Sequence, residues 1–175
     1  EKILPIAKEL RDGGIVGGIS LSVQSLDPTT LKNIKRANIK FEKFSDLTTT
    51  FRQNNIPTYT EVIVGLPGET LTTFKNGLET IAQTKVGTFL WNICSVLPNA
   101  PMNVPEYKEK FKIKTQTSPI KLRHASLEYI KKDRIHEEEE IVTETYSYKT
   151  EELKQMLLYA WALSTYQNLG IFEHF

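Results

Sequence analysis

The stretch TYTEVIVGLPGET, residues 58–70, predicts a β-strand, a tight turn and a helix in immediate succession. Its apolar, β-branched run is typical of a buried strand, and the Gly-Leu-Pro-Gly turn at residues 65–68 ends that strand. Apolar residues then recur every three or four positions over residues 71–81, which indicates a helix. One carboxylate, Glu61, lies inside the strand. Ligands gather at the carboxyl ends of strands in parallel α/β sheets, so this turn is the first candidate for a binding edge.

Two more strands are predicted, one on each side of this unit in the sequence. Residues 18–24 (GISLSVQ) alternate apolar and polar side chains, which is the period of a strand. We expect the apolar set to face outer helices and the polar set, which ends in Gln24, to point into a barrel interior. Residues 88–97 form a third run, rich in Phe, Trp and Ile. Helices are predicted at residues 3–10, 28–34, 44–51 and 71–81.

This alternation of helices and strands over residues 1–97 indicates a parallel sheet with right-handed crossovers. Three strands alone would leave two unpaired edges, which is a poor stopping point for a parallel sheet. Further strands are therefore expected before residue 1. The chain also begins with Glu1 inside a helical pattern. Both features lead us to expect a piece of a longer protein.

The last third of the chain follows a different pattern. A proline-rich loop leads into a short helix predicted at residues 106–111, and residues 115–135 are mixed and basic. Residues 140–148 are expected to form a strand. Residues 150–169 predict a long helix, because apolar positions repeat along one face.

Gly170 is the expected end of that helix, and Met156 and Trp161 are expected to lie in the core. We therefore predict an α/β fold in two parts. Parallel β/α units occupy residues 1–114, and an α-rich extension of one strand plus a long helix occupies residues 115–175.

Composition limits the function classes. With 39% hydrophobic and 25% charged residues, the 175-residue chain is ordinary for a soluble globular domain. A net charge of +1 creates no bulk attraction to nucleic acid or to a membrane, and no apolar run approaches the ~20 residues of a membrane span. The single cysteine, Cys94, excludes an internal disulfide and a cysteine-held metal cluster within this chain. We expect a cytoplasmic protein with no metal site, no nucleic-acid partner and no membrane partner.

Three polar side chains form the candidate site. Glu61 lies in an apolar strand, where an unpaired carboxylate is costly, so it needs either a ligand or a salt-bridge partner. Gln24 ends its strand and has two interpretations, contact with a ligand or satisfaction of nearby backbone groups. Arg36 by itself is typical of a surface arginine. Cys94 is interpreted as a core thiol.

Three elements in this order resemble the second half of a radical S-adenosylmethionine (radical SAM) enzyme. They are SVQSLDP at residues 22–28 followed by Arg36, EVIVGLPGET at residues 61–70, and NICSVLP at residues 92–98. GLPGET alone is a moderate signature, whereas the ordered set is a strong one and covers about residues 1–100. The resemblance implies a partial TIM-like barrel, in which the three predicted strands would be the fourth, fifth and sixth.

The resemblance also implies that S-adenosylmethionine lies across the open top of the barrel and that a CxxxCxxC loop holds a [4Fe–4S] cluster. That loop is absent here, so the cluster would belong to the upstream half of the same protein. The parent enzyme would generate a 5′-deoxyadenosyl radical that modifies a small-molecule or peptide substrate, and the protein would supply positioning. This chain alone is expected to be inactive and to hold no catalytic residue.

Four residues would contact S-adenosylmethionine by resemblance to the coproporphyrinogen dehydrogenase branch. Gln24 would reach the ribose hydroxyls, because an amide offers both a donor and an acceptor to a diol. Arg36 would bind the methionine carboxylate with its planar guanidinium. Glu61 would lie on the ribose side of the ligand. Ser95 would lie where the sixth strand runs past the adenine and contacts it through backbone groups.

The segments LPNAPM at residues 97–102 and PEY at residues 105–107 are similar to the sequences of radical SAM enzymes that carry an N-terminal cobalamin-binding domain. Many of those enzymes are methyltransferases, and their cobalamin would be held upstream of this chain.

Two alternatives stay open, a non-catalytic α/β half-barrel that binds a partner and an ordinary TIM-barrel enzyme without iron. Self-association through exposed sheet edges is open as well.

Overall fold

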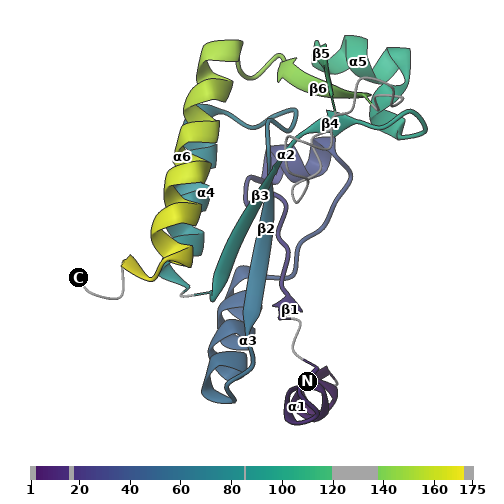
Figure 1. Ribbon diagram of the computed structural model, residues 1–175. Coiled ribbons are helices and arrows are strands. Elements are labelled where there is room, and N and C mark those ends of the chain that lie inside the picture. The colour runs from purple at the N-terminus through teal and green to yellow at the C-terminus, as the bar shows by residue number, and fades with distance from the viewer. Residues whose placement is uncertain (1–2, 16–17, 85, 120–137, 172–175) are drawn as a thin grey trace, which may run out of the picture.

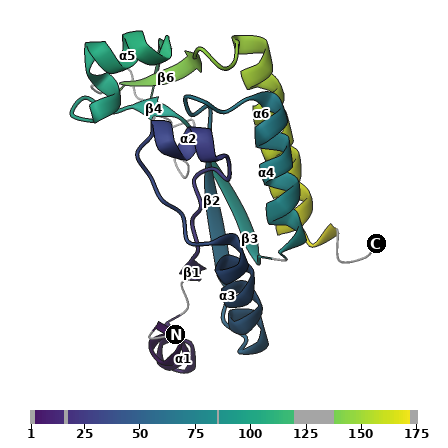
Figure 2. The same cartoon turned by 180° about the vertical axis from the view of Figure 1, so that it is seen from behind.

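The computed structural model describes residues 3–15, 18–84, 86–119 and 138–171, and Figure 1 traces the chain. A central parallel sheet is covered on one side by two long helices, α4 and α6, which lie side by side in both views (Figure 1, Figure 2). A second three-stranded sheet lies at one end (Figure 1). In chain order the elements are α1 Ile3–Asp12, β1 Ile19–Ser20, α2 Pro28–Asn33, α3 Phe41–Gln53, β2 Thr58–Val64, α4 Leu71–Gln83, β3 Thr88–Ile93, β4 Ser95–Val96, a 3₁₀ helix Pro101–Asn103, α5 Pro105–Phe111, β5 Lys114–Pro119, β6 Glu138–Glu144 and α6 Thr150–Asn168.

The first sheet has the order β1-β2-β3, and both strand pairs are parallel, as predicted. β1 is shorter than expected, because regular pairing covers only Ile19 and Ser20. The chain then returns to β2 at an isolated bridge between Gln24 and Val62. Ser20 pairs with Tyr59, so the chain advances four residues, from Ser20 to Gln24, while β2 advances three, from Tyr59 to Val62. One extra residue therefore bulges out just before Gln24.

The two faces of the sheet differ as the alternating pattern predicts. Leu21 and Val23 are buried, whereas Ser20 and Ser22 are exposed. β2 alternates in the same way, with every second side chain buried. The buried face packs on the apolar sides of α4 and α6 in one hydrophobic core. The opposite face, which includes Glu61, is only partly covered by the described residues.

The long helix α6 ends as predicted, with Gly170 in a left-handed conformation at φ 66°. Met156 is fully buried in the core. The expectation that Trp161 shares this environment is wrong, because its side chain is 56% exposed. Five residues separate the two positions, which places them about 140° apart around a helix, so one core-facing stripe cannot include both.

The second sheet is antiparallel, with the order β4-β6-β5. β3 and β4 form one nearly continuous strand through Cys94, whose N–H donates to the Val64 carbonyl at 2.8 Å. The Cys94 carbonyl accepts from Val142 of β6 at 2.9 Å. β6 thus takes over from β2 as the neighbour of this strand. β5 was not predicted, and the division of the chain at residues 114 and 115 stays a prediction.

The outer edge of β3 is partly covered by the end of α6. The side chain of Asn168 accepts from the Phe89 N–H and donates to the Phe89 carbonyl, both at 2.9 Å. This amide occupies the position that the peptide group of another strand would take. Among the described residues, no helix has both the length and the apolar composition needed to cross a membrane.

Candidate functional site

The carboxyl ends of the parallel strands lie at the edge of the sheet where α2 and α4 begin. Asp27 caps α2 by accepting from the Thr30 N–H at 2.7 Å, and Pro28 occupies the first helical position. Thr70 caps α4 through a reciprocal pair of hydrogen bonds with Thr73. These caps fix the two loops that follow β1 and β2. The predicted strand–turn–helix unit is therefore confirmed.

Gln24 follows β1 and forms an isolated parallel bridge with β2, next to Glu61. The Gln24 N–H donates to the Glu61 carbonyl at 3.2 Å, and the Gln24 carbonyl accepts from Ile63 at 2.9 Å. Gln24 adopts φ 54°, a left-handed conformation that residues with side chains seldom adopt and that collects at ligand sites. Within the described part of the chain, neither side chain has a hydrogen-bond or ion-pair partner. The salt-bridge alternative for Glu61 therefore finds no support among these residues.

Arg36 lies beyond the C-terminal end of α2 and is exposed. Its backbone N–H donates to the Leu31 carbonyl at 2.9 Å. Two residues later, the Asn38 side chain donates to the Ser25 carbonyl at 2.6 Å, which ties this segment back to the end of the first strand. The guanidinium has no partner among the described residues, so it is free to bind a ligand.

Ser95 lies in β4, where it pairs with Ile141 of β6. Its side chain lines a groove of about 580 Å³ that follows β3, together with Leu90 and Asn92. The structure thus brings Gln24 and Glu61 together and sets Ser95 one strand away. The ligand-binding roles of these residues, and of Arg36, stay predictions.

A clamp that the sequence did not reveal holds the GLPG loop, residues 65–68. The buried Tyr148 hydroxyl donates to the Gly65 carbonyl at 2.6 Å, and the Gly68 N–H donates to the Ser147 hydroxyl at 3.0 Å. From the other side, the Asn33 amide donates to the Pro67 carbonyl at 3.0 Å. Tyr148 and Ser147 come from the C-terminal extension. The only sign of this contact in the sequence is the presence of two tyrosines, Tyr146 and Tyr148, within the polar stretch of residues 143–150.

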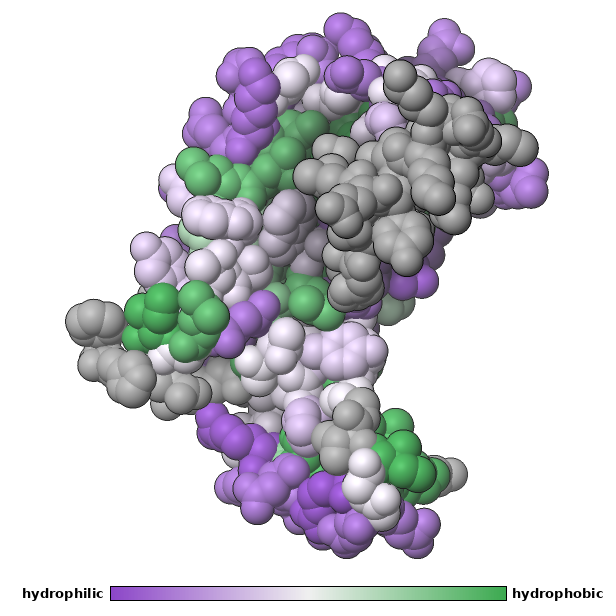
Figure 3. Space-filling view, in the orientation of Figure 1, coloured by the Kyte–Doolittle hydropathy of each residue, from purple (hydrophilic) through white to green (hydrophobic). Residues whose placement is uncertain are grey.

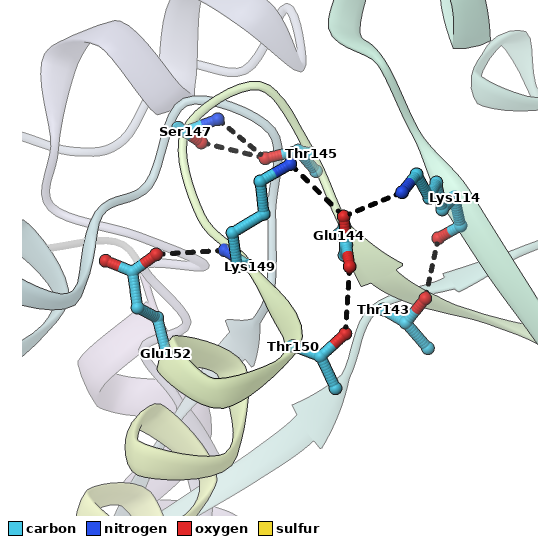
Figure 4. Close-up of polar contacts among 8 residues, drawn as sticks. All are labelled: Lys114, Thr143, Glu144, Thr145, Ser147, Lys149, Thr150 and Glu152. Carbon is cyan, nitrogen blue, oxygen red and sulfur yellow. Dashed lines mark hydrogen bonds and ion pairs between the residues drawn. The ribbon is translucent and has the colours of Figure 1, made fainter.

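The clamp is held in turn by a polar network at the end of β6 (Figure 4). The Glu144 carboxylate accepts from Lys114 at 3.0 Å and from both Lys149 and Thr150 at 3.2 Å. The Ser147 and Thr145 hydroxyls are 2.9 Å apart. Hydrogen bonds from Lys114 and Lys149 lower the pKa of Glu144 below its usual value. These contacts fix the turn that carries Ser147 and Tyr148.

Glu69 is a second feature that the sequence did not reveal. Its side chain is only 2% exposed, and it accepts hydrogen bonds from the Ser25 hydroxyl at 2.5 Å and the Thr73 hydroxyl at 2.6 Å. Burial raises the pKa of Glu69, and the nearby Asp27 charge adds to that effect, while the two hydroxyls oppose it. Glu69 therefore joins the loop after β1 to the start of α4.

The cysteine does not suit a cluster ligand. Burial raises the pKa of the Cys94 thiol to about 12, so the thiolate that iron requires is scarce near neutral pH. Among the described residues, no group of three histidine, cysteine or carboxylate side chains could hold a metal ion.

Comparison with known proteins gives consistent matches. Residues 3–81 match the Radical SAM superfamily. The chain is 34% identical over 117 residues to the cobalamin-dependent radical SAM methyltransferase TokK from Streptomyces tokunonensis, covering 66% of this chain and 17% of TokK. It is 35% identical over 112 residues to a 2-(S-pantetheinyl)-carbapenam-3-carboxylate methyltransferase from Streptantibioticus cattleyicolor, covering 61% of this chain and 16% of that protein.

Among solved structures, the fold resembles the radical S-adenosylmethionine methyltransferase TsrM from Kitasatospora setae. One structure, with tryptophan and a SAM analogue bound, gives a TM-score of 0.56 at 18% identity, covering 83% of this chain and 31% of TsrM. A second, with cobalamin and a [4Fe–4S] cluster bound, gives a TM-score of 0.55 at 16% identity and the same coverage. The chain thus spans about a sixth of the length of the curated relatives that it matches. The predicted α/β fold, consistent with part of a TIM-like barrel, is confirmed.

Proposed function

This chain belongs to the radical SAM superfamily, and we propose that it forms the C-terminal half of the catalytic barrel of a cobalamin-dependent methyltransferase. Members of the superfamily bind S-adenosylmethionine and a [4Fe–4S] cluster. The observation that carries the proposal is the pair Gln24 and Glu61. Gln24 forms an isolated parallel bridge with β2, where its N–H donates to the Glu61 carbonyl, and neither side chain has a partner among the described residues.

The residues of this edge suit S-adenosylmethionine. A partly covered carboxylate without a partner is costly, and a ribose diol could donate hydrogen bonds to Glu61. The Gln24 amide would complement the same diol, and Arg36 would bind the carboxylate of the methionine portion with a bidentate pair. In this role the three residues bind and orient the cosubstrate and transfer no proton.

The residues present do not suit the iron–sulfur cluster. The chain has one cysteine, whose thiol is buried, so at least two of the three ligands of a CxxxCxxC loop would have to come from elsewhere. We propose that an upstream half of the same protein supplies the cluster loop and the cobalamin site. This chain alone would then be inactive.

An uncovered apolar surface supports the existence of such a half. α1 presents Ile3, Ile6 and Leu10 to solvent, with 47%, 57% and 40% of each residue exposed. Only Ala7 of α1 is buried. In a larger barrel these residues would cover the strand that precedes α1.

When bound, the cluster and S-adenosylmethionine supply the reductive cleavage of the sulfonium and, with cobalamin, the methyl transfer. We propose a small-molecule substrate, because one relative is named for a carbapenam carboxylate. A cytoplasmic setting, which would keep Cys94 and the cluster reduced, is part of the same proposal.

The test compares the full-length protein with this chain. Full-length protein, reconstituted without oxygen and then reduced, should release 5′-deoxyadenosine or S-adenosylhomocysteine from S-adenosylmethionine. Glu61→Gln should weaken S-adenosylmethionine binding about tenfold, the loss of roughly one charge-assisted hydrogen bond. The matched control is Glu42→Gln, an exposed glutamate in the first turn of α3.

Calorimetry on the 175-residue chain alone should detect no tight binding of S-adenosylmethionine, because half of the pocket is missing. Tight binding by the isolated chain would contradict the half-barrel proposal. A full-length protein that binds no cluster would favour the alternative of a non-catalytic half-barrel.

A further inference from the structure

Residues at the end of α2 and along α5 line a pocket. The two helices lie near each other at the end of the molecule opposite α1 (Figure 1, Figure 2). The pocket volume of about 440 Å³ is within the range of small-molecule sites. One side carries Lys32 and Lys35 from the end of α2, and the other carries Lys110 from α5. Glu106 is the one acidic residue that lines it, so the charged lining has a net charge of +2.

The three lysines are available for a ligand. None has an ion-pair partner among the described residues. Lys110 instead lies over the Phe111 ring, with its Nζ 5.0 Å from the ring centroid. Lys35 adopts φ 54°, a left-handed conformation at the end of α2 where glycine is the usual residue. The Lys35 side chain lines the pocket, so the chain turns at the end of α2 with a cation at this site.

The pocket has an aromatic wall that connects it to the candidate site. The Tyr107 ring packs on Phe111 with centroids 4.5 Å apart, and the Tyr107 hydroxyl donates to the Asn33 carbonyl at 2.9 Å. The side chain of Asn33 in turn donates to the Pro67 carbonyl in the GLPG loop. One residue therefore links the pocket to the loop beside Gln24 and Glu61.

We propose that this pocket binds the anionic end of the substrate, a carboxylate or phosphate attached to an apolar body. The lysines would bind the anion, and the Tyr107 ring with Val104 would cover the apolar part. Naming the ligand as the substrate rests on the proposed function. The binding chemistry itself rests only on the pocket.

The test uses the 175-residue chain and three probes, namely phenyl phosphate, phenylacetate and the neutral 2-phenylethanol. Amide chemical shifts are followed by NMR at residues 32–35 and 110–111. Both anions, or one of them, should cause saturable shifts there, and raising the salt concentration should weaken them, because exposed charges are screened. The neutral probe should cause none. The stronger anion identifies the source as phosphate or carboxylate.

Variants locate the binding. Lys32→Gln combined with Lys110→Gln should weaken the better anion at least tenfold without lowering Tm by more than a degree or two, because both side chains are exposed. The control Lys43→Gln removes an exposed lysine of α3 that does not line this pocket, and it should leave the affinity unchanged.

Equal binding of the neutral probe, equal loss in Lys43→Gln, or unsaturable shifts at every exposed lysine would each overturn the proposal. The titration contains no iron, reductant or S-adenosylmethionine. Its failure would leave the radical SAM assignment standing, and failure of cluster reconstitution would leave the anion pocket standing.

Discussion

The GLPG loop and the end of the first strand lie side by side, but they differ in whether their polar groups have hydrogen-bond partners within the fold. Around the loop, the Gly65 and Pro67 carbonyls, the Gly68 N–H and the Glu69 carboxylate all have partners within the fold. The side chains of Gln24, Arg36 and Glu61 have none among the described residues.

This difference separates scaffold from binding surface. Buried polar groups must be paired for the chain to fold, so the loop contacts are needed with or without a ligand. Polar groups that a fold leaves unpaired at the edge of a parallel sheet can be paired by a ligand. Substitutions in the loop should therefore change the free energy of unfolding, and substitutions at the strand end should change ligand affinity.

The largest effect on stability is expected from Gly68→Ala. A Cβ at Gly68 would lie 2.5 Å from Asn33 Nδ2 and 3.2 Å from the Thr30 Cα, at φ +107°. Unfavourable backbone conformation together with this clash should lower the free energy of unfolding by about 3 kcal/mol. Chemical denaturation would measure the change.

Gly77→Ala is the matched control for that substitution. Gly77 lies inside α4, and its added Cβ would meet only the Leu26 Cβ at 3.8 Å. Alanine should stabilise the helix by about 0.5–1 kcal/mol. If both variants lost the same amount of unfolding free energy, the conformation of the GLPG loop would not be what Gly68→Ala disturbs.

Tyr148→Phe should have the next largest effect. It removes the donor to the buried Gly65 carbonyl and should cost about 1–3 kcal/mol of unfolding free energy. Tyr146→Phe is the control, because Tyr146 is 48% exposed and water can replace its contact with Asn33. Thermal unfolding of both variants distinguishes a clamp from a passive contact, since equal small losses would mean that the extension does not hold the loop.

The elements of the fold that could be predicted from the sequence are those whose signals lie close together along the chain. The strand–turn–helix unit at residues 58–83 was predictable because each signal, apolar run, turn and cap, lies within a few residues of the next. β5 was missed because KTQTSP has no apolar residue and forms an exposed edge strand. Its pairing with β6 depends on contacts outside the segment.

The candidate site was predictable only in part, for a related reason. The strand alternation placed Gln24 and Glu61 at one sheet edge, but the bulge that gives Gln24 its left-handed conformation has no local signal. The clamp joins Gly65 to Tyr148 across 83 positions, so no short pattern could reveal it. The burial of Glu69 follows only from the packing of the loop after the first strand, which brings Ser25 to its carboxylate.

Glu69 should also give the loop a pH dependence that the strand end lacks. Burial raises its pKa above 4.5, so the folded state binds this proton more tightly than the unfolded state does. The resulting stability is complete below about pH 4.5 and is lost as the pH rises through the folded-state pKa. In Glu69→Gln, the decline of unfolding free energy above pH 4.5 should become shallower.

Glu144→Gln should act in the opposite direction, because its lowered pKa stabilises the fold above pH 4.5 and that contribution is lost as the pH falls. Denaturation series that extend from about pH 2 to pH 8 would separate the two carboxylates, because the Glu144 effect lies below pH 4.5 and the Glu69 effect above it. An unchanged slope in Glu69→Gln would mean that Glu69 is not buried in solution.

The smallest effect on stability, and the sharpest test of the comparison, is expected from Gln24→Gly. Glycine adopts φ 54° without strain, so the variant should be as stable as the parent or more stable by up to ~1 kcal/mol. Asn55→Gly relieves the same conformation at φ 52°, just after α3, and is the matched control. Both should behave alike in denaturation, whereas only Gln24→Gly should weaken S-adenosylmethionine binding by the full-length protein. If Gln24→Gly instead destabilised the chain, the glutamine would belong to the scaffold and the division between the two regions would fail.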